Sequence, residues 1–279
     1  MKKLLLIIVL FVNGFAFSQN QKLKDDNINE CSGIAVSTLS DHLMWVHNDS
    51  GDNSRIFLID DKGNTVATYN FNKEVKDCED IAISYQNGGN SKIFVGDIGD
   101  NKAARPYISI FKLTEPDVKI TSKKELKICD VEELKFKYPN GSRDAECLMV
   151  DKRDQKIYII SKREDSVGVY SAPLNSKAGL IITLKKEAEL FFNAPKVSKW
   201  VTAGDISRDG KVVVVKTYIN IYYWDRKENE TIPECIKRAY IGLPYKPEGQ
   251  GEAVGLTRSG RFYYSIPEGK FAEITFKAI

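Results

Sequence analysis

A short phrase that carries an acid or a hydroxyl group recurs five times along this chain, each time ahead of an apolar hairpin. The residues that align at the polar position of the phrase are Ser32, Glu79, Glu146, Thr202 and Glu252. Carboxylates gathered at one point repel one another, and a hard cation such as calcium removes that repulsion by taking oxygen ligands. The repeat therefore predicts a calcium site. The alternative is a structural ring that caps backbone groups and binds water.

A second motif occurs twice, as Asp49-Ser-Gly-Asp-Asn53 and as Asp97-Ile-Gly-Asp-Asn101, and an arginine follows each copy. This composition is typical of a calcium loop but also of an ordinary turn, and the sequence leaves both interpretations open. A carboxylate beside a metal can take a proton from water. The candidate general bases are Asp49, Asp97 and Asp144. Other acids flank the repeated position and are candidates for further ligands or bases, namely Glu30, Asp80 and Asp205.

Basic residues follow the second strand of several repeats and could form a binding site for an anion. They are Arg55, Arg105, Lys162, Arg163 and Lys216, and His47 lies beside the first loop. Guanidinium and ammonium groups around cation-holding carboxylates suit an oxyanion or a phosphate. Alternatively, these are solvated charges at hairpin ends that point in different directions. The first interpretation predicts an anionic small molecule as substrate or ligand.

The elements that must position these residues are short strands. Two further runs rich in Val, Ile, Tyr and Phe follow each acidic phrase, with turn residues between them. Five such repeats predict an all-β fold with a single β-propeller of five blades, and a sixth, irregular blade is possible near Asp117–Asp130. The last repeat stops after its third strand, so Gln21–Ile28 is expected to close the ring beside Phe271–Phe276. Fourth strands are predicted at Val66–Phe71, Leu134–Tyr138 and Ile236–Ile241.

The first 18 residues have the pattern of a secretory signal peptide. Two lysines precede the apolar run Leu4–Val12, which is too short to span a bilayer, and small residues follow it. Residues 19–279 are then one exported domain, periplasmic or extracellular, with no membrane span, and we expect a monomer. The formal charge of +3 is small, and no stretch is basic and aromatic enough to predict a nucleic acid polymer as partner. The five cysteines lack the spacing of a zinc site.

Several phrases resemble those of a bacterial family of exported β-propellers whose function is unassigned. They are His47-Asn-Asp-Ser-Gly-Asp52, Gly96-Asp-Ile-Gly-Asp-Asn101, Arg143-Asp-Ala-Glu146 and Gly249-Gln-Gly-Glu-Ala253. The resemblance covers nearly the whole mature chain and implies the propeller fold.

The order of the repeated polar residues is also similar to that of the soluble calcium-activated nucleotidases, or apyrases. That family has five blades, and Glu and Ser residues of its inner strands hold a central calcium. The resemblance implies a Glu-x-Ser phrase at Glu30–Ser32, a ligand Glu at Glu79, Glu146 and Glu252, and a hydroxyl at Thr202. The surrounding sequence differs, and the paired Asp-x-Gly-Asp-Asn loops depart from that family.

The resulting hypothesis is an exported calcium-binding propeller that hydrolyses a phosphorylated or otherwise anionic substrate. One alternative is a non-catalytic propeller that binds a ligand or partner and has a structural calcium. Another is a lactonase-like or phosphotriesterase-like propeller, which also uses acids in its channel. The sequence contains no Gly-x-Ser-x-Gly, Walker or His-Glu-x-x-His motif, so those hydrolase and nucleotide-binding classes have no support.

Overall fold

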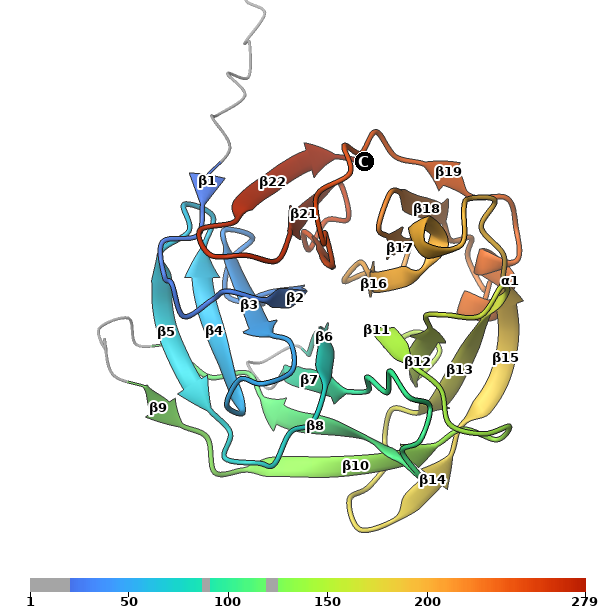
Figure 1. The fold of residues 1–279 in the computed structure, drawn as a ribbon, viewed down its shortest axis with the longest axis horizontal. Coiled ribbons are helices and arrows are strands. Elements are labelled where there is room, and N and C mark those ends of the chain that lie inside the picture. The colour runs from blue at the N-terminus through green and yellow to red at the C-terminus, as the bar shows by residue number, and fades with distance from the viewer. Residues whose placement is uncertain (1–20, 87–90, 119–124) are drawn as a thin grey trace, which may run out of the picture.

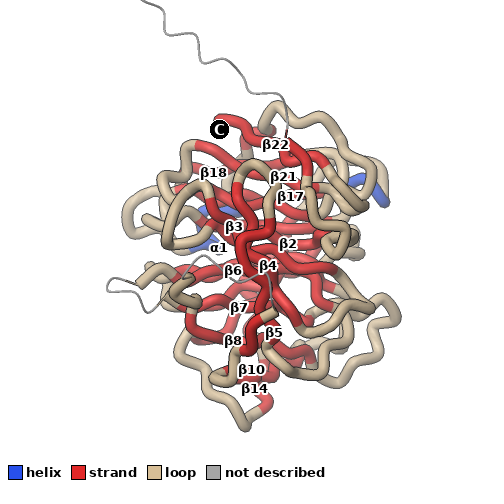
Figure 2. Tube along the Cα trace, turned by 90° about the vertical axis from the view of Figure 1, so that its left-hand side faces the viewer, coloured by secondary structure: helices blue, strands red, loops and turns tan. Residues whose placement is uncertain are grey.

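The computed structural model describes residues 21–86, 91–118 and 125–279, and these form five sheets arranged in a ring around a central axis (Figure 1). The prediction of an all-β, five-bladed propeller is confirmed. Seen from the side, the strands occupy the middle of the molecule and the loops gather on its two faces (Figure 2). No helix in the described ranges is long and apolar enough to cross a membrane. The predicted signal peptide, residues 1–18, lies outside the described residues.

Each blade starts at the axis and runs outward through four strands. The inner strands are β2 (Cys31–Val36), β6 (Cys78–Ser84), β11 (Ala145–Asp151), β16 (Val201–Ile206) and β20 (Ala253–Leu256). The second strands are β3 (Leu43–Asn48), β7 (Lys92–Asp97), β12 (Lys156–Ser161), β17 (Val212–Thr217) and β21 (Phe262–Ile266). The third strands are β4 (Arg55–Asp60), β8 (Ile108–Thr114), β13 (Val167–Pro173), β18 (Ile221–Asp225) and β22 (Glu273–Ala278). The fourth strands are β5 (Thr65–Asn70), β10 (Val131–Lys137), β15 (Lys185–Leu190), β19 (Ile241–Gly242) and β1 (Gln21–Lys22).

The two ends of the described chain meet in blade 5. Strand β1 pairs antiparallel with β22, with Gln21 opposite Ile274 and Lys22 opposite Glu273. This is the predicted closure, and it joins the first segment of the propeller to the last. Strand β1 thus supplies the fourth strand of blade 5, and its pairing closes the ring.

The outer strands decide against the alternative of a sixth blade and correct the bounds of one predicted strand. The described part of Asp117–Asp130 contributes only β9 (Leu126–Lys127), which extends blade 1 in parallel with β5 and is not a sixth blade. Strand β14 (Ile181–Thr183) extends blade 2 in the same way. A short helix, α1 (Ile232–Ile236), ends at the first residue of the strand predicted at Ile236–Ile241, and the observed fourth strand, β19, begins only at the last residue of that range. Thr231 caps this helix in a capping box with Glu234, a local signal that outweighs the apolar pattern.

The hydrophobic core is divided among the five seams between neighbouring blades. Successive residues of an inner strand face opposite seams, so Ile34 packs toward blade 5 and Ala35 toward blade 2. The largest buried side chains, such as Trp45, Trp224 and Tyr158, lie in these seams. Cys31, Cys78 and Cys147 are buried free thiols in the inner strands. The packing sets the distance between blades and therefore the width of the central channel.

Two carboxylates of the inner strands link neighbouring blades through backbone hydrogen bonds. Asp80 accepts the N–H of Leu148 at 2.8 Å, which joins blade 2 to blade 3. Asp205 accepts the N–H of Leu256 at 2.8 Å, which joins blade 4 to blade 5. Each also accepts the N–H of the residue that follows it. The structure therefore assigns Asp80 and Asp205 to the linkage between blades, and not to the candidate ligands or bases.

The Asp205 linkage predicts that stability falls as the pH rises. Burial raises the pKa of Asp205 from 3.8 to about 7. The folded state gains the full stabilisation from protonated Asp205 below pH 4, and this stabilisation is lost as the pH rises through 7. Over that range the free energy of unfolding falls by on the order of 1 kcal/mol per pH unit. We expect Asp205→Asn to flatten the decline in melting temperature between pH 5 and pH 8. An unchanged slope in the variant would show that Asp205 has the same charge in the folded and unfolded chains.

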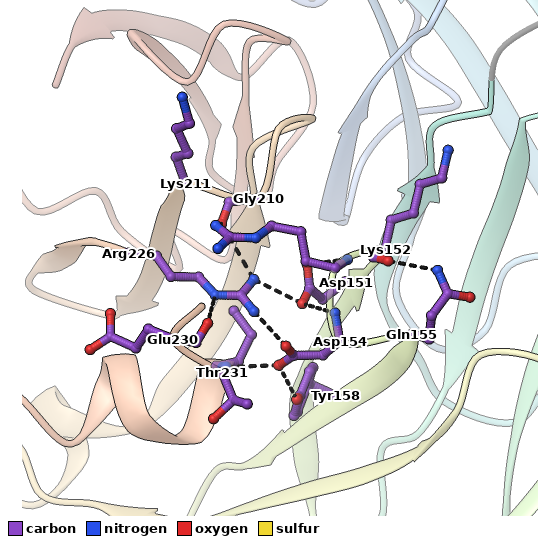
Figure 3. A network of polar contacts seen from close by, with 12 residues as sticks. Asp151, Lys152, Asp154, Gln155, Tyr158, Gly210, Lys211, Arg226, Glu230 and Thr231 are labelled. Carbon is purple, nitrogen blue, oxygen red and sulfur yellow. Dashed lines mark hydrogen bonds and ion pairs between the residues drawn. The ribbon is translucent and has the colours of Figure 1, made fainter. Parts of the chain in front are cut away.

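A buried ion-pair network joins blades 3 and 4 at the end of the inner strands opposite to the repeated acids (Figure 3). The guanidinium of Arg226 donates to Asp151 at 2.8 Å and also to Asp154. Asp154 accepts further hydrogen bonds from the hydroxyl of Tyr158 and the N–H of Ile232. The Arg226 and Asp151 side chains are 1% and 2% exposed, so each buried charge needs the other to compensate it.

Candidate metal centre

The five aligned polar residues form a ring at one end of the inner strands because the backbone bulges there. In four blades the pairing with the second strand skips one residue, and that residue is Ser32, Glu79, Glu146 or Thr202. In blade 5, Glu252 directly precedes β20 at the equivalent position. A bulge turns a side chain out of the alternation of the strand. The sequence alignment of these five residues thus corresponds to one structural feature, which we call the inner ring.

A second set of side chains follows the second strands and lies next to the inner ring. The strand register places five residues in equivalent positions, namely Asp49, Ile98, Lys162, Tyr218 and Glu268. We call this set the upper ring. Three of its members contact the inner ring directly, since Lys162 donates to Glu146, Tyr218 donates to Glu252 at 2.8 Å, and Glu268 shares a hydrogen bond with Glu252.

One half of the site, contributed by blades 5, 1 and 2, is acidic. One carboxylate oxygen from each of Asp49, Glu79 and Glu252 lies within 4.8 Å of the other two. Burial, and then the charges of Glu146 and Asp49, raise the pKa of Glu79 well above its usual value. Burial raises the pKa of Asp49 to about 6, and burial with a hydrogen bond to Glu252 raises that of Glu268 to about 8. These carboxylates repel one another without a cation.

The donor set fits a calcium ion. Glu79 and Glu146 are 2% and 4% exposed, and Oε2 of each has no hydrogen-bond partner among the described residues. A buried carboxylate oxygen without a partner is costly. Ser32 Oγ donates to the carbonyl of Glu79 at 2.7 Å, which leaves its lone pairs free to act as ligands. Ionised and hydroxyl oxygens without nitrogen or sulfur are the ligands that calcium prefers.

Asp97 and Asp144, two of the three predicted bases, are each bound to an arginine instead of facing the axis. Both oxygens of Asp97 accept hydrogen bonds from Arg105, at 2.9 Å each. Asp144 accepts from Arg163 and from the N–H of Asp100. The structure therefore places both carboxylates in ion pairs with arginine. Asp49 is the one of the three that adjoins the inner ring.

The strand register also corrects the alignment of the two repeated loops. Asp97 occupies the register position of Asn48, and not that of Asp49. Asn48 and Asp97 have the same structural role, because each accepts a backbone N–H from the segment that leads into an inner strand. Asn48 Oδ1 accepts the N–H of Glu30 at 3.2 Å, and Asp97 Oδ1 accepts the N–H of Asp77 at 2.8 Å.

Turn chemistry accounts for the remaining acids of these loops. Asp100 accepts the backbone N–H groups of Ala104 and Arg105, at 2.9 and 2.8 Å. Asp52 accepts the N–H of Asn53 at 2.7 Å and both of its oxygens contact Nε of Arg55 at 3.0 Å. The interpretation of these loops as turns is therefore favoured over that of calcium loops.

The basic residues do not converge on the axis as a set. Arg55 pairs with Asp52, and Arg105 with Asp97. Arg163 pairs with Asp144 and stacks on the ring of Trp200 at 4.6 Å. Because an acid neutralises each arginine, the predicted site for an anion is not assembled from them. Of the predicted cations only Lys162 belongs to the upper ring.

Lys216 and His47 are enclosed within the blades. The ammonium of Lys216, which is 0% exposed, donates to the hydroxyl of Tyr245 at 2.9 Å and to Glu248 at 3.4 Å. Burial lowers its pKa to about 8. His47 Nδ1 donates to the carbonyl of Asn48 at 2.8 Å, and burial lowers the pKa of His47 to about 4. Neither side chain is positioned to bind a substrate at the channel mouth.

The sequence analysis did not nominate Tyr218 or Glu268. Both follow a second strand at the position of Lys162, so aligning the hairpins from their second strands could have found them. Tyr218 and Glu268 lie in the segments Lys216-Thr-Tyr218 and Ile266-Pro-Glu-Gly269, and neither segment contains an aspartate like Asp49. Only the register makes them equivalent.

Comparisons with known proteins identify the fold and nothing more specific. No protein-family model and no curated protein matches the chain. A propeller from Xanthomonas campestris, described as a gluconolactonase important in glucose secondary metabolic pathways, is similar with a TM-score of 0.50 and 12% identity, over 89% of this chain and 72% of that one. A chain in the nidogen–laminin complex has a TM-score of 0.48 and 12% identity, over 86% of this chain and 73% of that one. At such identity the likeness shows a β-propeller fold.

Proposed function

We propose that this protein is an exported hydrolase that binds one calcium ion at the channel mouth and acts on an ester or a lactone. The observation that carries the proposal is the pair of buried, unpartnered Oε2 atoms of Glu79 and Glu146 beside the carboxylates of Asp49 and Glu252. Glu79, Glu146 and Glu252 would hold the ion with the hydroxyls of Ser32 and Thr202. When bound, calcium supplies positive charge that polarises a substrate carbonyl.

Asp49 is the residue that we assign to proton transfer. One of its oxygens accepts the N–H of Ser50, and the carboxylate lies within reach of the inner ring. A pKa of about 6 leaves it ionised at neutral pH and basic enough to take a proton from an attacking water. Lys162 and Tyr218 bound the opposite side of the site, where they hold Glu146 and Glu252 in place.

Charge favours a neutral substrate over a polyphosphate. The acids around the axis are Asp49, Asp77, Glu79, Glu146, Glu252 and Glu268, and the only ammonium among the upper-ring residues is that of Lys162. The acids outnumber the ammonium groups at the channel mouth, and this excess disfavours the approach of a highly charged anion. The fold likeness to a propeller described as a gluconolactonase is compatible with a lactone but does not by itself support it.

A polar groove of about 470 Å³ beside Asp49 can accommodate the body of such a substrate. Its lining comes from blades 1 and 5 and consists of Asp26, Asn27, Asn29, Glu30, Ser50, Gly51, Asp52, Arg55 and Lys270. It contains no aromatic residue on which a nucleobase could stack. The volume is in the range of small-molecule sites, and the lining favours a hydrophilic ligand.

The test is a comparison of substrates with and without calcium. We expect hydrolysis of δ-valerolactone or phenyl acetate that a chelator abolishes, and a loss of about 10²–10⁴-fold in kcat for Asp49→Asn. Asp97→Asn should not share that loss, because Asp97 is held by Arg105. Equal losses in the two variants would contradict the assignment of the base.

The resemblance of the inner-ring order to the apyrases favours phosphoesters as a second substrate class. Nucleoside diphosphates and p-nitrophenyl phosphate therefore belong in the same assay. Hydrolysis of these compounds, with esters and lactones untouched, would replace the first proposal by the second. Calcium binding without activity on any of these substrates would favour a non-catalytic binding propeller.

A further inference from the structure

The upper-ring residue differs in charge from blade to blade. Asp49 of blade 1 and Glu268 of blade 5 adjoin Glu252, whereas blade 3 contributes Lys162 at the same register position. Lys162 is 4% exposed, although lysine is seldom buried without a specific partner. The ammonium of Lys162 therefore lies inside the channel mouth and is not a solvated surface charge.

The surroundings of this ammonium resemble a cation site. Lys162 Nζ donates to Glu146 Oε1, and it donates to the hydroxyl of Tyr218 at 3.1 Å. The ammonium also lies 5.2 Å from the centre of the Tyr218 ring and 6.0 Å from that of the Trp200 ring. The Glu146 carboxylate is thus the ion-pair partner of this ammonium, and the two aromatic rings add cation–π contacts.

We propose that the ammonium of Lys162 occupies the position of a second cation in the ring, so that the site binds one divalent ion and not two. The inference rests on the proposed calcium site. The divalent ion belongs to the half formed by Asp49, Glu79 and Glu252, where one carboxylate oxygen of each residue lies within 4.8 Å of the other two. In the other half Lys162 pairs with Oε1 of Glu146, which leaves Oε2 of Glu146 for the divalent ion.

The geometry supports this division of the ring. Glu146 uses one oxygen for Lys162, while its Oε2 is buried without a partner. Tyr218 links the two halves, because its hydroxyl donates to Glu252 at 2.8 Å and accepts from Lys162. Without the ammonium, Oε1 of Glu146 and the hydroxyl of Tyr218 would lose the positive charge that both of them contact. Oxygen donors in that arrangement attract a second hard cation.

The experiment counts calcium ions by titration calorimetry and by elemental analysis of dialysed protein, with calcium as the only added ligand. We expect one ion per chain in the native protein and two in Lys162→Met. Lys162→Gln keeps a hydrogen-bond donor for Glu146 and removes the charge, so it should also bind two if Lys162→Met does not fold. The matched control is Lys199→Met, which removes another buried lysine, one that pairs with Asp165 at 2.6 Å. It should still bind one ion.

The outcomes separate this inference from the proposed function. Two ions in the native protein would overturn the inference and leave the calcium site standing. One ion with unchanged affinity in a folded Lys162→Met or Lys162→Gln variant would also overturn it. Absence of calcium from the native protein would instead overturn the proposed function on which the inference rests.

Discussion

Replacing Glu79 by Gln is expected to abolish the stabilisation of this protein by calcium. An ion at 100 times its Kd stabilises the native state by about 2.7 kcal/mol, which raises the melting temperature of a chain of this size by roughly 5–10 °C. Glu79 contributes a buried oxygen without a partner next to Asp49 and Glu252. Gln keeps the shape of the side chain and removes the charge that holds the ion.

The expected effect of Glu79→Gln on the melting temperature in the absence of calcium makes this prediction specific. Burial and neighbouring acids raise the pKa of Glu79, so its charge destabilises the metal-free fold. The variant in chelator should therefore melt at the temperature of the native protein or above it. Glu74→Gln makes the same change at an exposed position before β6 and should keep the full response to calcium. If chelator leaves the native protein unchanged and elemental analysis finds no metal, the inner ring is only structural.

Replacing Arg226 by Met is expected to cost the protein about 3–5 kcal/mol of unfolding free energy. Removing one partner of a buried ion pair leaves the other charge uncompensated. Here Asp151 and Asp154 would both lose the guanidinium that neutralises them across the seam of blades 3 and 4 (Figure 3). Denaturant unfolding monitored by tryptophan fluorescence measures the change, since Trp224 lies in the same seam.

An exposed pair between two other blades provides the matched control. Arg258 contacts Asp41 at 3.0 Å, and the two side chains are 31% and 37% exposed. Water screens such a pair, and its loss is worth about 1 kcal/mol or less. Arg258→Met should therefore change stability far less than Arg226→Met. Equal costs for the two variants would mean that burial of the Arg226 network does not determine its contribution.

The architecture could be predicted from the sequence because a propeller repeats its pattern. Each blade buries its strands in two seams, so every repeat carries the same alternation of apolar residues, and one polar position stands out against it. The closure by Gln21–Lys22 followed from the missing fourth strand of the last repeat. The strand expected at Ile236–Ile241 begins only at Ile241, because the capping box of Thr231 and Glu234 starts a helix that runs to Ile236.

The sequence by itself determined the inner ring, because the same bulge recurs in the same phrase of four blades. Only the tertiary structure decided which other charges join it. Glu268 and Tyr218 reach the ring through strand register, while Arg55 and Arg105 are neutralised by Asp52 and Asp97. The physical reason is that strand register and loop conformation decide which side chains come close together, and residue types and spacing alone do not specify either.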